Sequence, residues 1–381
     1  MPSDYNNIHN EHRLDYGRKL TDWAQDHLAN RYSDRTHFIF ELLQNAEDVL
    51  RERGESLKPT SVHFELKADG LEVRHFGKPF TPENVKSICA INESTKRNEL
   101  TEIGRFGIGF KSVYAFTKHP EIHSDDEHFA IDQFVLPIAV PPRRLAEQET
   151  LFWIPFNTDD ASAVEDVAAA LRNLGCERLL FLKSVTEITW SLHDGTSGVF
   201  LKNPSMPDSN GQIITLIGEV DGEGITIEQN WLLFSRIVKH QSGAPAGCVE
   251  IAFCVESGEN GELRIVEVDE SKLVVFFPTE VSTGLGFLIQ GPYRTTPSRD
   301  NVPQNDEWNR MLVRETAKLL VDSLDSLKLR NLLVADTLGV FPIEARRYGM
   351  ESMFRPLFDA TQKALFELAV LPAAGGGHVA G

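Results

Sequence analysis

Apolar and polar positions follow two different periods in the first half of the chain. Spacings of three and four residues predict amphipathic helices, whereas strict alternation around an Asp69-Gly70 pair predicts a β-hairpin. The polar segment 84–102 lacks strong periodicity and suits a mobile lid. The elements predicted in this half are helices at 13–30 and 33–53, the hairpin strands 61–66 and 71–76, strands at 128–136 and 151–156, a helix at 161–174 and an apolar stretch at 179–190.

The second half begins with a run of strands and closes with a long helix. The predicted strands are 198–201, 212–220, 224–229, 248–255, 263–267 and 273–277, and the helix is 305–327. With 381 residues the chain is too long for one ordinary core. We therefore expect an α+β protein with domains at 1–190 and 191–330, followed by a helical segment at 331–381.

Composition narrows the function classes. Hydrophobic residues make up 41% of the chain, which is typical of a folded protein, and the net charge of −18 argues against broad contact with nucleic-acid phosphates. The four cysteines form no C-x-x-C pair, so neither a zinc ribbon nor a disulfide scaffold is indicated. Residues 1–10 are polar and no apolar run approaches the length of a membrane span. We expect a cytoplasmic protein.

One face of the helix predicted at 33–53 carries candidate chemistry. Glu41, Asn45 and Asp48 are spaced i, i+4, i+7, which places them within an arc of about 60° on a helix. Their oxygen atoms are of the kind that holds Mg²⁺ beside phosphates, and a spare carboxylate can take a proton from water. Taken alone, such a trio is more often a solvated helix face.

A glycine cluster follows about sixty residues later. Gly104, Gly107 and Gly109 let the main chain approach an anion closely, and residues 110–116 have the pattern of a helix whose N-terminus would face it. The order G-x-x-G-x-G is neither the dinucleotide fingerprint nor a P-loop. Alone, the cluster is also compatible with a tight turn that binds nothing.

Together these segments resemble the ATPases of the gyrase, heat-shock chaperone, histidine kinase and MutL superfamily, which share the Bergerat ATP-binding fold. The resemblance is strongest to sacsin-type and plant No Vein-type proteins and their bacterial relatives. The matching segments, in order, are the N-box 41–48, the first glycine box 73–81, the start of the lid 91–96, the second glycine box with its helix 103–116, and the strand 149–155, whose threonine closes the nucleotide pocket.

The resemblance implies roles for single residues. Glu41 would be the general base, Asn45 the protein ligand of Mg²⁺, and Asp48 a pocket residue that orients bound water. Lys96 or Lys111 would add a positive charge at the phosphates, although each is equally compatible with a solvated surface lysine. The nucleotide would be contacted by Asn45, Asp48, His75, Gly77, Phe80, Lys96, Gly104, Gly107, Ile108, Gly109, Phe110, Lys111 and Thr150.

The first glycine box departs from the family pattern. Most members have Asp-x-Gly-x-Gly, and the aspartate accepts a hydrogen bond from the adenine amino group. Here His75 replaces that aspartate and Pro79 replaces the second glycine. A neutral imidazole accepts one hydrogen bond only in the right tautomer. ATP is still expected, with adenine selectivity open.

The second half resembles the transducer domain that follows the ATPase domain in this superfamily. Its Ser298-Arg299-Asp300 triplet resembles the chaperones' Ser-Arg-Glu, so Arg299 would reach the γ-phosphate and stabilise the transition state. The alternative is a surface arginine paired with Asp300. The glycine-rich stretch after Leu371 resembles the start of a further domain in larger relatives, which is the interpretation we favour, and a flexible tail is the alternative.

The resemblance as a whole implies a conformational clamp that binds Mg-ATP and hydrolyses it slowly. Such modules often dimerise around ATP, so a homodimer or larger assembly is expected, with a chaperone-like output or, in a bacterial setting, a defence against phage. The alternative is a non-hydrolysing, nucleotide-dependent scaffold. A histidine kinase is disfavoured because no dimerisation helix with a phosphate-accepting histidine precedes the N-box.

Overall fold

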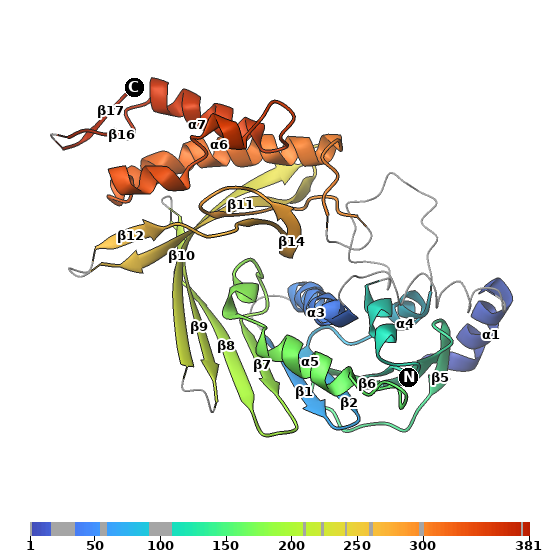
Figure 1. Cartoon of the computed structure of the whole chain (residues 1–381). Coiled ribbons are helices and arrows are strands. Elements are labelled where there is room, and N and C mark those ends of the chain that lie inside the picture. The colour runs from blue at the N-terminus through green and yellow to red at the C-terminus, as the bar shows by residue number, and fades with distance from the viewer. Residues whose placement is uncertain are drawn as a thin grey trace. The chain divides into compact units, whose positions relative to one another are not determined.

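A computed structural model describes residues 2–16, 35–53, 59–90, 109–208, 211–221, 225–240, 242–258, 262–296, 301–374 and 376–381. The chain divides into two compact units (Figure 1). The first contains Met1–Lys202 and Ile217–Ile227, and the second contains Asn203–Leu216 and Glu228–Gly381. Strands in a large mixed sheet are accompanied by helices, in agreement with the predicted α+β class. The division falls within three strands, β8 (Ser197–Pro204), β9 (Gln212–Val220) and β10 (Ile225–Lys239).

Seven strands of the first unit follow the order β7-β1-β2-β6-β3-β4-β5. The pair β1 and β7 is parallel, and the other neighbours are antiparallel. The predicted hairpin is confirmed, with Lys67 opposite Gly70 across the turn. The strands are β1 (Ser61–Lys67), β2 (Gly70–Phe76), β3 (Glu121–Ser124), β4 (Glu127–Asp132), β5 (Leu136–Ala139), β6 (Glu149–Pro155) and β7 (Glu187–Ser191).

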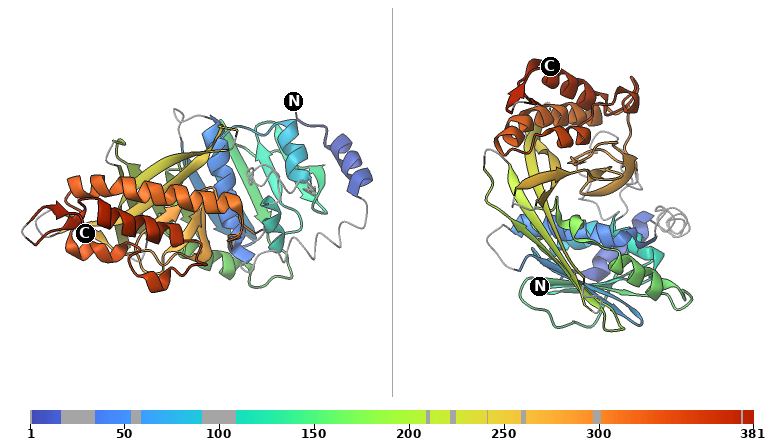
Figure 2. Two further views of the ribbon diagram at one scale, coloured as in Figure 1. Left: turned by 90° about the horizontal axis from the view of Figure 1, so that it is seen from above. Right: turned by 60° about the vertical axis from the view of Figure 1, so that its left-hand side comes forward.

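The two faces of this sheet differ because side chains alternate along each strand. On one face, called the inner face here, Val62, Phe64 and Leu66 of β1 are fully buried. Helices α3 (Phe38–Arg53) and α5 (Ala163–Arg172) pack against β2 and β1, and Figure 2 shows them beside these strands. The apolar stripe of each helix thereby covers the apolar side of the strands.

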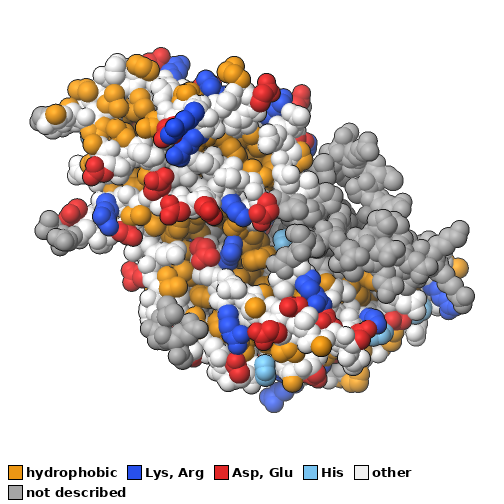
Figure 3. Space-filling view, viewed as in Figure 1, with side chains coloured by type: hydrophobic (Ala, Val, Ile, Leu, Met, Phe, Trp, Pro, Cys, Tyr) orange, Lys and Arg blue, Asp and Glu red, His pale blue; other side chains and the backbone are white. Residues whose placement is uncertain are grey.

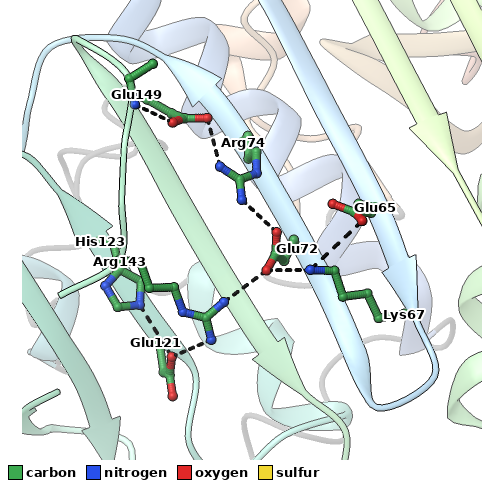
Figure 4. A network of polar contacts seen from close by, with 9 residues as sticks. Glu65, Lys67, Glu72, Arg74, Glu121, His123, Arg143 and Glu149 are labelled. Atoms are coloured by element: carbon green, nitrogen blue, oxygen red, sulfur yellow. Dashed lines mark hydrogen bonds and ion pairs between the residues drawn. The ribbon is translucent and has the colours of Figure 1, made fainter. Parts of the chain in front are cut away.

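The opposite, outer face is held by ion pairs (Figure 4). The Glu72 carboxylate contacts Lys67, Arg74 and Arg143 at 2.8, 2.8 and 2.9 Å. Lys67 and Arg143 also lie over the ring of Trp153. Burial raises the pKa of Glu72, but hydrogen bonds from Lys67 and Arg74 outweigh it and hold that pKa below its usual range. The basic side chains of this network are thus engaged with Glu72.

Two helices of the first unit differ from the prediction. Helix α1 spans Tyr5–Tyr16, so it begins earlier than the helix expected at 13–30, most of which lies outside the described residues. The segment expected to be an irregular lid begins with helix α4 (Pro82–Cys89). Thr81 caps α4 by accepting a hydrogen bond from the Asn84 amide, and the Asn84 side chain accepts one from Thr81 in return. This short helix depends on its cap, and its pattern is too brief to show a period.

The helix predicted after the glycine cluster is a 3₁₀ helix, η2 (Phe110–Ala115). Another short 3₁₀ turn, η1 (Arg35–His37), leads directly into α3. Arg35 donates a hydrogen bond to the carbonyl of Ala115 at 2.9 Å and stacks on Phe116, so the start of α3 is fixed to the end of η2. A third, η3 (Cys176–Leu179), follows α5.

The second unit contains a sheet with the order β14-β13-β15-β11-β10, and β12 pairs with β11. Helix α6 (Glu307–Leu329) is capped by Asp306 and packs against β11 and helix α7 (Arg355–Glu367). It confirms the long helix predicted at 305–327. The remaining strands are β11 (Pro245–Ser257), β12 (Leu263–Val266), β13 (Lys272–Val275), β14 (Phe277–Ser282) and β15 (Leu288–Gln290).

Two predictions for the second unit are wrong in detail. The strand expected at 273–277 is divided into β13 and β14 at Phe276, whose φ of 64° reverses the chain. The segment expected to be helical after 330 also contains the 3₁₀ turns η4 (Ala335–Val340) and η5 (Ala345–Arg347) and a small hairpin. The strands of that hairpin are β16 (Leu371–Pro372) and β17 (His378–Val379).

Candidate functional site

Helix α3 carries the predicted acidic and amide face. Glu41 is buried, with 2% of its surface exposed, whereas Asn45 and Asp48 are half-buried. The Glu41 carboxylate lies 3.5 Å from the Nε2 atom of His37, one helical turn before it. Within the described chain, the Asn45 side chain makes no hydrogen bond. Asp48 accepts a hydrogen bond from Arg51 at 2.6 Å, so this carboxylate is partly neutralised at the surface.

The same helix approaches two glycines of the predicted glycine boxes. At Gly109, an added Cβ would lie 2.9 Å from the carboxylate carbon of Glu41 and closer still to its Oε2 atom. At Gly77, an added Cβ would lie 2.5 Å from a methyl group of Val49. Both approaches are possible only without a side chain on the glycine. Segments far apart in the sequence thus meet along α3.

Three buried polar residues form a row across the inner face of the sheet. His75 on β2 is the direct cross-strand neighbour of Thr150 on β6, and Thr150 is the neighbour of Ser124 on β3. The Ser124 and Thr150 hydroxyls lie 2.7 Å apart, and Ser124 also accepts a hydrogen bond from the Phe80 amide at 3.1 Å. We call His75, Thr150 and Ser124 the polar row. It brings together two residues, His75 and Thr150, that the sequence assigned separately to a nucleotide pocket.

His75 is the member of the row with unusual electrostatics. Only 3% of its surface is exposed, and burial, with a smaller contribution from the charge of Arg53, lowers its pKa to about 4. The ring is therefore neutral at physiological pH. Its Nδ1 atom is buried and has no hydrogen-bond partner among the described residues. Buried polar atoms are rarely left in this state, so this nitrogen needs an explanation.

Aromatic rings surround the polar row. Phe152 lies two residues after Thr150 on the same strand, and its ring centroid is 5.7 Å from that of His75 and 5.6 Å from that of Phe110. The ring of Phe80 stands edge-on to Phe152 at 6.4 Å. Phe80 and Phe110, both predicted to contact nucleotide, therefore belong to one cluster. Apolar walls with a few buried polar atoms are typical of small-molecule sites.

Lys111 has a different place from the one expected. Its ammonium is buried and donates hydrogen bonds to the carbonyls of Ile88, at 2.7 Å, and Phe134. Burial lowers its pKa to about 8. It is therefore not a solvated surface lysine. Because its ammonium bonds to these two carbonyls, it does not present its charge to a phosphate in this arrangement. The ammonium instead fixes η2 to the end of α4 and to the turn at Phe134.

Several predicted site residues lie outside the described parts of the chain. These are Lys96, Gly104, Gly107, Ile108 and Arg299, together with the lid start at 91–96. Their roles stay predictions. The positions that can be placed are those on α3, β2, β6 and η2 and the turn around Gly77 and Phe80.

Sequence reasoning missed two residues that organise this region. Glu47 of α3 is buried, and its carboxylate accepts hydrogen bonds of 2.8–3.0 Å from the amides of Lys183, Ser184 and Val185. Its spacing from Leu43 and Leu50, on the apolar side of α3, was an available signal. Ser124 gave no local signal, because its role comes from the pairing of β3 with β6.

Comparison with known proteins gives three matches. The Sacsin domain family matches residues 73–138. The protein NO VEIN of Arabidopsis thaliana is 29% identical over 322 residues, which cover 77% of this chain and 11% of that protein. Human sacsin is 32% identical over 122 residues, which cover 30% of this chain and 3% of sacsin. These matches support a sacsin/No Vein relationship.

The sacsin-domain match covers only part of the candidate site. It begins within β2 and ends within β5, so it contains His75, Gly77, Phe80 and Gly109 but not Glu41 or Thr150. The chain spans only a small part of both sacsin/No Vein relatives. None of the helices in the described ranges is long and apolar enough to cross a membrane.

Proposed function

We propose that the first unit is a Bergerat-type module that binds Mg-ATP and hydrolyses it slowly. The observation that carries the proposal is the contact of α3 with both glycine positions, Gly77 through Val49 and Gly109 through Glu41. A helix that presents an acid and an amide between two glycine segments is suited to a nucleotide, because backbone amides and oxygen ligands then surround one anion. The sequence similarity to sacsin and No Vein agrees with the family resemblance on which this proposal also draws.

In this proposal Glu41 and Gly109 belong to the phosphate end of the site. Glu41 would take a proton from the attacking water, and its carboxylate lies 3.5 Å from the Nε2 atom of His37. Asn45 fits a metal ligand, since its half-buried amide makes no hydrogen bond to the described chain. The described residues hold no cluster of three or more metal-binding side chains. Mg²⁺ would therefore take its other ligands from phosphate and water, as it usually does, and would neutralise phosphate charge.

The polar row and its aromatic neighbours would form the base end. The hydroxyls of Thr150 and Ser124 form a hydrogen bond with each other, whereas the Nδ1 atom of His75 has no partner among the described residues and would bond to a ligand. The rings of Phe80, Phe110 and Phe152 would exclude water and pack against the flat faces of the base. We further propose that nucleotide turnover drives a conformational clamp of the heat-shock-chaperone type.

Phosphate release and nucleotide affinity, measured side by side for ATP, ADP and GTP, test the proposal. Glu41→Ala should keep Mg-ATP binding and lose turnover, whereas Asn45→Ala should lose both. Glu165→Ala is the matched control, because this glutamate is exposed on α5. Wild-type turnover in the Glu41→Ala protein would remove the assigned base. Binding without any hydrolysis by the wild type would favour the scaffold alternative.

A further inference from the structure

The polar row contains a fully buried polar atom that has no hydrogen-bond partner among the described residues. The hydroxyls of Thr150 and Ser124 bond to each other, and Ser124 also receives the Phe80 amide. The Nδ1 atom of His75 has no partner in the described chain, although it is fully buried. Leaving a buried polar atom unpaired is costly, and a ligand that pairs with it recovers this cost.

The chemistry of this atom differs from that of a carboxylate in the same place. An ionised carboxylate only accepts hydrogen bonds, so it binds an amino group, which donates one, and repels a carbonyl oxygen. A neutral imidazole has one donor and one acceptor nitrogen, and the tautomer decides which is which. In one tautomer Nδ1 accepts a hydrogen bond, and in the other it donates one. His75 is free to meet either kind of group because no described neighbour fixes its Nδ1 tautomer.

We infer that His75 makes the base end a general purine pocket, which accepts a 6-amino or a 6-oxo purine nucleotide with similar affinity. This inference rests on the proposed nucleotide site and concerns its selectivity. His75 accepts a hydrogen bond from a 6-amino group and donates one to a 6-oxo group. Adenine and hypoxanthine differ in the group at C6 and in the proton that hypoxanthine carries on N1, and neither has a 2-amino group, so ATP and ITP are the matched probes.

Three variants separate this role from a structural one. His75→Asp replaces the imidazole with a group that only accepts, and the nearby positive charge of Arg53 would stabilise the new carboxylate. His75→Asn keeps a donor and an acceptor on a side chain that can turn over. His63→Asn is the control, since His63 lies on the outer face of the same hairpin and bonds to Thr189.

The experiment measures dissociation constants of Mg-ATP and Mg-ITP by calorimetry, with circular dichroism to check folding. For the wild type, His75→Asn and His63→Asn, we expect the two constants to agree within about tenfold, whereas His75→Asp should prefer ATP by about 100-fold or more. If His75→Asp does not fold, the wild-type and His75→Asn ratios still decide.

Other results would overturn the inference. A wild-type preference for ATP of about 100-fold or more would show that His75 has a fixed tautomer. An unchanged ratio in folded His75→Asp would show that His75 does not face the base. Failure of the wild type to bind either nucleotide would instead remove the proposed function itself, and with it the site on which this inference rests.

Discussion

Gly109→Ala offers a sharp test of the contact between the glycine loop and α3. The backbone of Gly109 has φ −59° and ψ −44°, a conformation that alanine adopts without strain. Any effect of the substitution must therefore come from the added methyl group. That group would lie 2.9 Å from the carboxylate carbon of Glu41.

The size of the effect follows from this distance. Two carbon atoms rest at about 3.5–4.0 Å, so the Glu41 carboxylate must withdraw by about 1 Å. Because a catalytic group displaced by about 1 Å can lose about 100-fold in rate, we expect a decrease of that order in ATP turnover. The affinity for ATP should change much less, and the melting temperature should shift by only a few degrees, since a carboxylate can move without opening the core.

The assay combines phosphate release at saturating ATP with thermal unfolding. Gly339→Ala is the matched control, because an added Cβ there meets no atom within 4 Å. In a Glu41→Ala background, Gly109→Ala should lower the residual ATP turnover hardly any further, because the carboxylate that it would displace is already absent. Full turnover in Gly109→Ala, or an undiminished loss in the double variant, would refute the reasoning.

Three further predictions concern stability. Gly77→Ala should lose about 1–3 kcal/mol, because the new Cβ meets the stiff, branched Val49 at 2.5 Å; chemical denaturation should show the loss, and Val49→Ala should restore part of it. Glu47→Gln should lose about 1.5–3 kcal/mol through weaker hydrogen bonds to the 183–185 amides, and an equal loss in exposed Glu52→Gln would contradict this. Folding lowers the pKa of His75 from 6.5 to about 4, so between these pH values the unfolded chain binds a proton that the folded protein does not. The contribution of His75 to the free energy of unfolding is therefore complete above pH 6.5 and decreases by up to about 3 kcal/mol as pH falls toward 4. Unfolding free energies from pH 7 to 5 should therefore fall more for the wild type than for His75→Asn, and parallel curves would exclude the assignment.

Local patterns were sufficient to predict the elements whose signals are contained within a few residues. The hairpin of β1 and β2 was predictable because alternation and an Asp-Gly pair occur together, although the turn itself is Ala68-Asp69 and Gly70 begins β2. Helix α3 was predictable because its apolar stripe runs over several turns. Strand β3 has only four residues, too few to reveal a period, and α4 required recognition of its cap.

The arrangement of the candidate site depends on pairing that no local pattern contains. His75 and Thr150 become neighbours only because β2 pairs with β6 in one register, and a slip by one residue would place them on opposite faces. Lys111 shows a second limit. A lysine next to a glycine loop suggests a phosphate contact, but two backbone carbonyls that come from elsewhere in the fold bind its ammonium.

The contact of Glu47 with the 183–185 amides determines the rotation of α3 about its own axis. Apolar side chains alone would allow a helix to roll, because their contacts have little directionality. A buried carboxylate bound by three successive amides permits one angle, since rolling by one residue, about 100°, would break every one of these bonds. The orientation of Glu41 and Asn45 is therefore set by a residue on the other side of the helix. Grafting the acidic face of α3 onto another scaffold would require Glu47 and the 183–185 segment, which supplies its amide partners, to be transferred with it.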